Sequence, residues 1–191
     1  MTPPLQRLRH GVRKLGHVRR VLFFYDDTEA ALPVVKVVEL LRLNLKQLIS
    51  DRGKPWGTNL GAMSWFDDGG RFFAVERDGV FVSFGWVKRS ETFGVGEIGG
   101  TVSLTKPVSW IWNCYTPEPY RGLGNYPALL KGIRRALGSP PTVIYCEAEN
   151  AASRRGIEKA GFRPAFAVSQ HPLFTRCRET IPRLYAGYRR A

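Results

Sequence analysis

The sequence predicts a single α+β domain, and three observations support this fold class. The chain has 191 residues, 43% of them hydrophobic, which suffices for one domain with a sizeable core. Segments typical of strands and of helices follow one another along it, and they include a hairpin signal at Asp78-Gly79. No repeat of fixed period is present, and no apolar run approaches the length that crosses a bilayer. We therefore expect a soluble protein made of one domain.

The first two thirds of the chain are predicted to form mainly strands. Strands are expected at residues 21–25, 32–38, 97–104 and 109–116, and residues 71–88 are expected to form two strands joined at Asp78 and Gly79. A helix is expected across residues 39–50, followed by a loop rich in Gly, Pro and Trp. In the strand at 109–116, the period of two places Trp110 and Trp112 on one face, and Asn113 and Tyr115 on the other.

The last third is predicted to contain two helices and a further strand. Pro127 suits the first turn of a helix, because the amide hydrogen that proline lacks would be unpaired there. This helix begins near 125–127 and carries an apolar face of Leu129, Leu130, Ile133 and Leu137. A buried strand is expected at residues 142–149, and Asn150 is expected to cap a helix that ends before Gly161. One or two closing strands and a basic tail complete the prediction.

The charge of the chain is concentrated at its two ends. The formal net charge is +13. Residues 1–20 hold six cations and no acid, a charge of +6, and residues 173–191 hold five arginines and one glutamate, a charge of +4. This distribution favours an anionic partner such as phosphates, nucleic acid or a membrane surface, and solvated tails are the alternative.

The first twenty residues are treated as a separate basic segment, followed by a domain at residues 21–191. The apolar residues of the segment are spaced three or four apart, which is typical of a basic amphipathic helix, although Gly11 and Gly16 weaken this prediction. These apolar residues are Leu5, Leu8, Val12, Leu15 and Val18, and Leu22, just after the segment, continues the same spacing.

The cysteines and histidines indicate neither disulfides nor a metal site. Cys114, Cys146 and Cys177 are an odd number with no CxxC pair, which favours a reducing, cytoplasmic compartment. Cys114 and Cys146 lie in apolar strand-like runs, so we expect buried core residues and not nucleophiles. The three histidines have no ligand-like spacing with the cysteines, and we expect no metal.

The segment PYRGLGNYPALL, residues 119–130, combines a cation and two glycines with the start of a helix. The first amides of a helix are unpaired and its dipole is positive there, so this arrangement favours an anion such as phosphate. Gly122 and Gly124 would allow close approach, and Arg121 adds a charge. An ordinary turn with glycines for its geometry is the alternative. The segment matches neither GxGxxG nor a P-loop, so a phosphate ligand of another kind is needed.

Two motifs together resemble the GNAT superfamily of acyl-CoA-dependent N-acetyltransferases. TPEPYRGLGNY is similar to its pyrophosphate loop, and NAASRRGIEKAGF, residues 150–162, is similar to its second signature. Arg121 and Asn150 lie 29 positions apart, in the right order for a helix and a strand between them. The resemblance implies a mixed, mostly antiparallel twisted sheet flanked by helices, with strands splayed at the CoA site. It also implies direct acetyl transfer from acetyl-CoA to an amine, without an acyl-enzyme on Cys114.

The resemblance also implies a set of cofactor-binding residues. Backbone amides from Arg121 to Tyr126 would hold the diphosphate of CoA, and the end of the preceding strand and the start of the next helix would line the pantetheine arm. The implied residues are Tyr115, Thr116, Arg121, Gly122, Leu123, Gly124, Asn125, Tyr126, Asn150 and Ser153.

The catalytic residues are less defined, because the sequence departs from the family pattern at two positions. Tyr126 stands where the family usually has Gly or Ala, and Ile157 stands where many members have a tyrosine that reprotonates the CoA thiolate. Tyr126, Tyr145 or solvent are the candidate acids. Glu147 and Glu149 are candidates for the base or for binding the ammonium group, and surface acids before a helix cap are the alternative.

The acceptor favoured by the sequence is a bacterial amino sugar on a nucleotide or lipid carrier, because the Gly-x-Tyr-Pro variant of the loop resembles members associated with polysaccharide and cell-envelope synthesis. Alternatives are an aminoacyl-tRNA, a protein amine, or a CoA-binding regulatory module without catalysis. A homodimer and attachment to the inner membrane surface are further options that the sequence leaves open.

Overall fold

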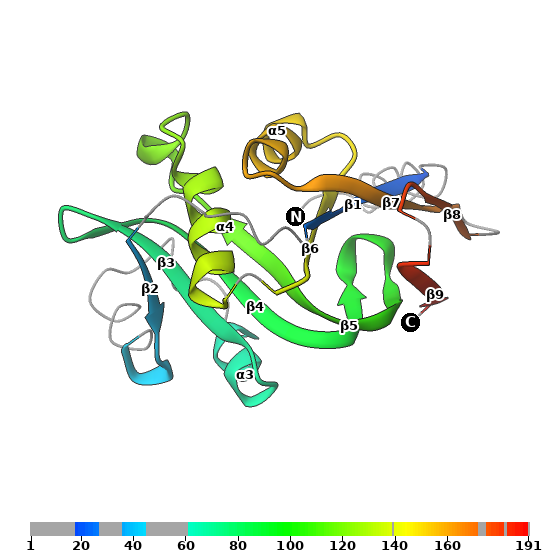
Figure 1. Ribbon diagram of the computed structural model, residues 1–191, viewed down its shortest axis with the longest axis horizontal. Helices are drawn as coiled ribbons and strands as arrows, with labels where there is room; N and C mark the ends of the chain where they lie inside the picture. Colours follow the sequence, from blue (N-terminus) through cyan, green and yellow to red (C-terminus); the bar gives the residue numbers. More distant parts are fainter. Residues whose placement is uncertain are drawn as a thin grey trace, which may run out of the picture.

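The computed structural model describes residues 18–26, 36–44, 61–138, 140–171, 175–181 and 183–190. These residues form a nine-stranded sheet with strand order β2-β3-β4-β5-β6-β1-β7-β8, and β9 pairs with β5 outside this path (Figure 1). The strands are β1 Arg19–Asp26, β2 Val37–Leu40, β3 Arg71–Arg77, β4 Val80–Val95, β5 Gly100–Tyr115, β6 Thr142–Glu147, β7 Arg163–Gln170, β8 Thr175–Glu179 and β9 Tyr185–Arg190. All neighbouring strands are antiparallel except β5 and β6, which are parallel.

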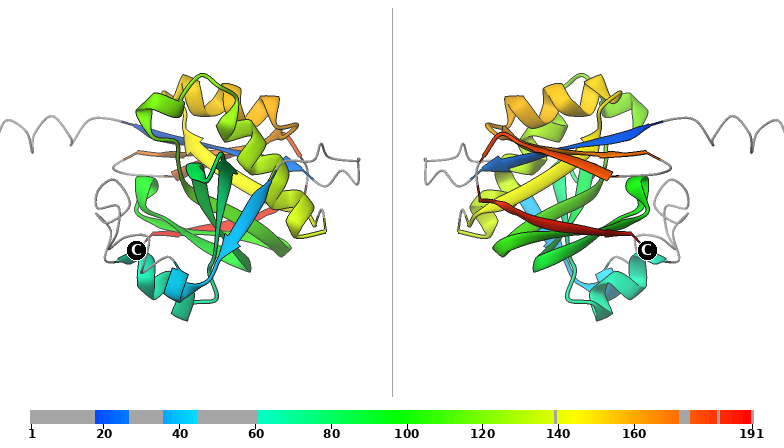
Figure 2. Two further views of the ribbon diagram at one scale, coloured as in Figure 1. Left: turned by 90° about the vertical axis from the view of Figure 1, so that its left-hand side faces the viewer. Right: turned by 90° about the vertical axis from the view of Figure 1, so that its right-hand side faces the viewer.

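Helices cover both faces of the sheet. The helices α4 Asn125–Ala136 and α5 Ala151–Lys159 lie on one face, and α3 Gly61–Asp67 lies on the opposite face (Figure 2). Short 3-10 helices occupy Gly96–Ile98 (η1) and Glu118–Tyr120 (η2). Among the described residues, no helix is both long enough and apolar enough to span a membrane.

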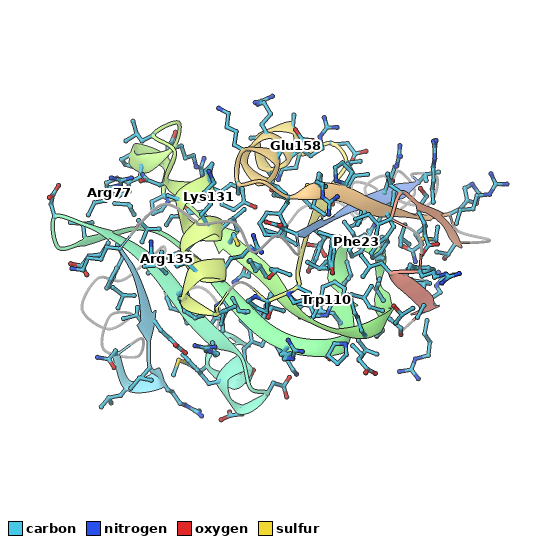
Figure 3. All side chains as sticks on the ribbon, viewed as in Figure 1. Phe23, Arg77, Trp110, Lys131, Arg135 and Glu158 are labelled. Atoms are coloured by element: carbon cyan, nitrogen blue, oxygen red, sulfur yellow. The ribbon has the colours of Figure 1, made fainter. Side chains whose placement is uncertain are left out.

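The core has three parts that alternate between the two faces of the sheet. Phe24, Ile111 and Ile144 pack with Leu129, Ile133 and Ile157 beneath α4 and α5. On the opposite face, Phe23 and Trp110 pack beneath η1 and β9 (Figure 3), and a second cluster around Trp86 packs against α3. Because side chains alternate along a strand, Phe23 and Phe24 contribute to opposite layers, which explains the apolar run in β1.

The local turn and cap signals of the sequence are confirmed. Asp78 and Gly79 have φ values of 51° and 74°, as a two-residue hairpin turn requires. The helix α4 begins at Asn125 with Pro127 in its first turn, and the backbone amide of Ser153 donates a 3.0 Å hydrogen bond to the side-chain oxygen of Asn150 at the start of α5.

Three expectations about strands and helices were wrong in part. The strands expected at 97–104 and 109–116 form one strand, β5, which continues across Pro107 because β4 pairs with it on both sides of this residue and β9 pairs with its first five residues. Glu97 and Ile98 lie in η1. Residues 39 and 40 belong to β2, although a helix was expected to start there. The basic tail forms β9, which pairs with β5. The helix α3 was not predicted.

Other predictions fall on residues outside the described part. These are the amphipathic helix at residues 1–17, most of the strand at 32–38 and the later part of the helix at 39–50. Of the basic segment 1–20, Val18, Arg19 and Arg20 are described. Arg19 and Arg20 belong to β1, as does Leu22, so the predicted helical stripe does not extend to Leu22.

A buried ion pair connects α4 to the sheet. The guanidinium group of Arg134 on α4 donates to the carboxylate of Asp26 at the end of β1, and the side chains are 0% and 2% exposed. The pair joins residues 108 positions apart. It therefore fixes the position of α4, whose first turn forms part of the candidate site, against a central strand.

Candidate active site

The candidate site lies where two parallel strands separate. β5 and β6 pair only through Ser109–Ile111 and Thr142–Ile144. Beyond these residues β5 continues to Tyr115 and β6 to Glu147, so the facing edges of both strand ends are not paired with each other. The splayed strands expected from the sequence motifs are therefore present.

A cleft of about 560 Å³ opens at this splay on the face that carries α4 and α5, and we call it the α4/α5 cleft. It contains all the predicted cofactor-binding residues except Leu123. These are Tyr115, Thr116, Arg121, Gly122, Gly124, Asn125, Tyr126, Asn150 and Ser153. The side chain of Leu123 is 67% exposed and lines a different hollow, beside Arg77.

The loop before α4 presents backbone amides to this cleft. Gly122 and Gly124 both have φ of 76°, a conformation that favours glycine, and a Cβ at either position would meet no atom within 4 Å. Within the described chain, the amides from Gly122 to Tyr126 make no backbone hydrogen bond of normal geometry, and the first bond of the helix joins the Ala128 amide to the Gly124 carbonyl. The glycines therefore serve the turn and also leave the amides accessible to an anion.

Asn125 holds the loop in place through its side chain. It is 2% exposed, its amide nitrogen donates to the Tyr120 carbonyl at 2.9 Å, and its side-chain oxygen accepts from Arg77 Nε at 2.7 Å. Arg77, at the end of β3, lies beside the first turn of α4 (Figure 3). The Asn125 side chain is thus a positioning group, and its backbone amide remains at the cleft.

Cations gather along the cleft. Arg121 Nε donates to the Thr116 carbonyl at 2.9 Å, and its guanidinium carbon lies 5.8 Å from the centre of the Tyr115 ring. Arg155 and Lys159 of α5 also line the cleft, and the sequence analysis did not assign them. Ala152, Arg155 and Lys159 follow one another at spacings of three and four residues, and this helical spacing is the signal that places them on one face of α5.

A second cleft, of about 690 Å³, lies on the opposite face of the sheet, and we call it the aromatic cleft. Its rings come from four elements: Trp65 of α3, Phe93 of β4, Trp112 of β5 and Tyr145 of β6. Phe93 and Trp112 lie 5.1 Å apart between ring centres, and Trp65 and Trp112 lie 5.8 Å apart. The cleft fills the space between the two core clusters on this face.

Neighbouring residues of β5 line the two clefts, Asn113 the aromatic cleft and Cys114 the α4/α5 cleft. Asn113 has φ of 47°, which is unusual for a residue within a strand, and a bulge occurs here because Phe84 pairs with Tyr115 while Trp86 pairs with Trp112. Asn113 therefore lines the aromatic cleft together with Trp112, and the Tyr115 ring packs with Phe84 in the cluster around Trp86, on this same face of the sheet. The prediction that Asn113 and Tyr115 lie on the face opposite Trp112 was wrong, because the extra residue shifts the alternation.

The polar groups of the aromatic cleft include two carboxylates and one cation. Glu97 and Asp68 contribute the carboxylates, and Lys88 Nζ lies 3.9 Å from an oxygen of Asp68. Burial raises the pKa of Tyr145 well above its ordinary value, and the nearby Glu97 carboxylate raises it further. The phenol of Tyr145 is therefore protonated at neutral pH.

No protein-family model matches this chain. Solved structures match it across most of its length. An acetyltransferase assigned to the GNAT family from Novosphingobium aromaticivorans aligns at 20% identity over 80% of this chain and 63% of that chain, with a TM-score of 0.51. The GNAT acetyltransferase from Colwellia psychrerythraea aligns at 13% identity over 83% and 58%, with a TM-score of 0.52. The chain has the GNAT fold. The expected fold class, a mostly antiparallel mixed sheet flanked by helices, is confirmed.

Two curated relatives share part of the sequence. The mycothiol acetyltransferase of Acidothermus cellulolyticus is 35% identical over 104 residues, which are 52% of this chain and 32% of that protein. The mycothiol acetyltransferase of Streptomyces avermitilis is 31% identical over 103 residues, 53% of this chain and 29% of that protein. The chain therefore spans about a third of the length of these relatives.

Within this GNAT fold, the two departures from the family motifs have structural explanations. Ile157 is fully buried in the core beneath α5, and its side chain does not line the cleft. Tyr126 packs its ring against Gly156 of α5, where a Cβ would lie only 2.4 Å from the ring, and its hydroxyl lies 3.3 Å from Ser153 Oγ. The ring therefore extends toward α5 and leaves the loop glycines open.

The acidity of the groups in the α4/α5 cleft is set by burial. Burial raises the pKa of Tyr126 well above its ordinary value, and the neighbouring Cys114 adds to this effect. Burial also raises the pKa of the Cys114 thiol to about 12. Cys114 is thus protonated at neutral pH, which agrees with the expectation that it is not a nucleophile.

The two glutamates proposed from the sequence lie outside both clefts. Glu147 and Glu149 are exposed at the end of β6 and in the turn before α5, and neither lines the α4/α5 cleft or the aromatic cleft. Their catalytic role stays a prediction. The carboxylates that do line a cleft, on Asp68 and Glu97, were missed because they come from a turn after α3 and from η1, which sequence patterns do not bring together. Among the described residues, no His, Cys, Asp and Glu side chains cluster as metal ligands.

Proposed function

We propose that this protein transfers the acetyl group of acetyl-CoA to a primary amine. The observation that carries the proposal is the pair of clefts that open on opposite faces of the sheet at the β5–β6 splay, with Asn113 lining one and Cys114 lining the other. Two substrates that enter from opposite faces can bring their reacting atoms together there, which is the proximity that a direct transfer needs. The sequence similarity to two acetyltransferases supports the same reaction.

The α4/α5 cleft would hold acetyl-CoA. The amides from Gly122 to Tyr126 and the positive end of α4 suit the diphosphate, and the cations of Arg121, Arg155 and Lys159 suit further phosphate charge. The unpaired edge of β5 near Tyr115 can bond the amides of the pantetheine arm in the manner of an added strand. Asn150 and Ser153, at the start of α5, would line the other side of the arm.

The reaction needs two proton movements. The nitrogen lone pair of a neutral amine attacks the thioester carbonyl carbon, the new carbon–nitrogen bond forms, and the carbon–sulfur bond breaks. The amine loses one proton to a base or to water, and the CoA thiolate takes up one proton. The products are an acetamide and free CoA, so no covalent enzyme intermediate is needed.

Tyr126 is the acid that we propose for the thiolate. Its hydroxyl lies in the α4/α5 cleft near Ser153 Oγ, and its raised pKa keeps the phenol protonated at neutral pH, so the O–H can donate a hydrogen bond to the forming thiolate and pass its proton to it. Tyr145, the other candidate, lines the aromatic cleft and so lies on the acceptor side. Glu97 is the carboxylate that we propose for binding the incoming ammonium group and for accepting its proton, directly or through water.

The acceptor that we propose is an amino sugar bound in the aromatic cleft. The ring faces of Trp65, Phe93 and Trp112 suit the apolar face of a pyranose, and the carboxylates of Glu97 and Asp68 suit its ammonium group. Lys88, the single cation among the described residues that line the cleft, lies close to Asp68, so a phosphate on a nucleotide or lipid carrier would have to remain outside the cleft. The names of the two curated relatives also make compounds related to mycothiol early candidates.

A non-catalytic CoA-binding module is the second candidate function, favoured by the buried Ile157 at the position of the usual acid. Acetylation of an aminoacyl-tRNA or a protein amine is a further alternative, consistent with the net charge of +13. The thiol-release assay described next distinguishes both alternatives from acetylation of an amino sugar.

A thiol-release assay tests the proposal. The full chain is incubated with acetyl-CoA and a panel of amino sugars, mycothiol-related compounds, polyamines and aminoacyl-tRNA, and free CoA is measured with a thiol reagent. The informative variant is Glu97→Gln, and the matched control is Glu91→Gln, an exposed glutamate of β4 outside both clefts. We expect turnover with an amino sugar, a loss of kcat/KM of roughly a hundredfold in Glu97→Gln, and little change in Glu91→Gln.

Three results would contradict parts of this proposal. Tight CoA binding without turnover on any amine would favour the non-catalytic module. Turnover only with aminoacyl-tRNA or a protein would remove the amino sugar as acceptor. An equal kcat/KM for Glu97→Gln and Glu91→Gln would remove Glu97 from the acceptor site.

A further inference from the structure

A basic hollow of about 390 Å³ lies apart from both clefts, on strands β1, β7 and β8. Arg20, Arg176 and Arg178 line it together with His171 and Ser169, and we call it the arginine hollow. It shares no residue with the α4/α5 cleft or the aromatic cleft. No acidic residue is among its described lining residues. Acetyl transfer as proposed above does not use it.

The strand register explains why the three arginines converge. Arg20 pairs with Ser169, which in turn pairs with Arg176, so the three residues form one row across the sheet and point to the same face. Arg178 lies two residues further along β8, opposite Ala167, and therefore also points to this face. Two strand spacings of about 4.8 Å separate Arg20 from Arg176. A phosphate above Ser169 can thus contact both guanidinium groups.

An apolar and basic sequence continues directly from the hollow. Val18 lines it and is 51% exposed. The preceding residues of the chain carry Arg7, Arg9, Arg13 and Lys14, and their apolar residues are spaced so that Val18 continues the same series. Cations beside exposed apolar side chains are the combination that binds the interface of an anionic bilayer, because the cations attract the headgroups and the apolar groups enter the acyl boundary.

We propose that the arginine hollow docks the protein on an anionic lipid bilayer, with a headgroup phosphate held between Arg20 and Arg176. Arg178 and His171 add positive charge or hydrogen-bond donors at the rim of the hollow. A lipid surface is favoured over RNA because Val18 is exposed beside the cations, while the imidazole of His171 is the one ring among the described lining residues on which a base could stack. The proposal does not depend on acetyl transfer.

Vesicle co-sedimentation with the full chain tests this docking. Two vesicle compositions are compared, phosphatidylcholine alone and a mixture of 70% phosphatidylcholine and 30% phosphatidylglycerol. The variant replaces the three hollow arginines by Arg20→Gln, Arg176→Gln and Arg178→Gln. The control replaces three cations elsewhere by Arg89→Gln, Lys106→Gln and Lys131→Gln, which lowers the formal net charge by the same amount. None of the control residues lines the hollow.

We expect the unaltered chain and the control to bind the anionic vesicles and not the neutral ones, and the hollow variant to bind roughly a hundredfold more weakly at low salt. Equal weakening of both variants would overturn the proposal, since net charge alone would then explain binding. Stronger binding to a single-stranded RNA than to the anionic vesicles, lost in the hollow variant, would assign the hollow to RNA and overturn it as well. Thermal melts of both variants show whether the comparison is made between folded proteins.

Discussion

The substitution Gly124→Asp tests the diphosphate site most directly. Gly124 precedes the first residue of α4, has φ of 76°, and faces open space at the position of a Cβ. An aspartate there brings a carboxylate to the positive end of the helix, where it competes with a phosphate for the same amides. Gly79→Asp is a matched control, because Gly79 has φ of 74° and equally open surroundings in the β3–β4 hairpin.

The size of the effect follows from Coulomb's law. A phosphate bound to the loop amides would lie about 5 Å from the new carboxylate, and at an effective dielectric constant of about 20 the repulsion is roughly 3 kcal/mol per charge. This corresponds to a loss of CoA affinity of about a hundredfold or more. The strain of a non-glycine residue at positive φ, about 1–2 kcal/mol, is common to both variants and does not distinguish them.

Isothermal titration with acetyl-CoA measures both dissociation constants, and thermal melts measure stability without ligand. We expect Gly79→Asp to keep the affinity of the unaltered chain and Gly124→Asp to lose it, with similar melting temperatures for the two variants. An equal dissociation constant in both variants would refute the assignment of the diphosphate to this loop.

Three further predictions concern groups inside the fold. Cys114→Ala should keep most of the turnover, and an acetyl group trapped on Cys114 by mass spectrometry would contradict direct transfer. Iodoacetamide should react slowly with Cys114 at pH 8, because burial raises the pKa of this thiol to about 12. Tyr126→Phe should lower kcat by about 10²–10⁴ with little change in acetyl-CoA affinity, and unchanged kcat would exclude Tyr126 as the acid. Arg134→Met should destabilise the protein by about 3–5 kcal/mol, because it leaves the Asp26 carboxylate buried without its cation. The double variant Asp26→Leu with Arg134→Met should restore most of this stability, as measured by denaturant melts.

The sequence by itself determined the features that depend on neighbouring residues. The hairpin turn at Asp78 and Gly79 follows from backbone angles that these two residues tolerate. The start of α5 follows from the hydrogen bond that the side-chain oxygen of Asn150 accepts from the backbone amide of Ser153, three residues later. The loop before α4 was predictable for the same reason, since Gly122 and Gly124 provide its positive φ angles. Because the α4/α5 cleft is built largely from this loop and the start of α5, many of the residues that line it were predicted without the structure, whereas Arg155 and Lys159 were not.

The aromatic cleft was decided only by the tertiary structure. Trp65, Phe93, Trp112 and Tyr145 come from four separate elements, and no local pattern indicates that the sheet brings their rings together. The bulge at Asn113 depends on the register between β4 and β5, which is set along the whole length of both strands, and it reverses the faces that the alternation predicts.

Long-range pairing also decided the remaining features that the sequence did not reveal. β9 forms because β5 offers a free edge along its first half, although its own basic sequence resembled a solvated tail. Arg134 is buried because Asp26, 108 positions earlier, meets it inside the core, and no local pattern around Arg134 indicates this pairing. Local backbone and capping preferences are properties of a few adjacent residues, whereas the register of distant strands and the pairing of buried charges exist only once those segments are packed together.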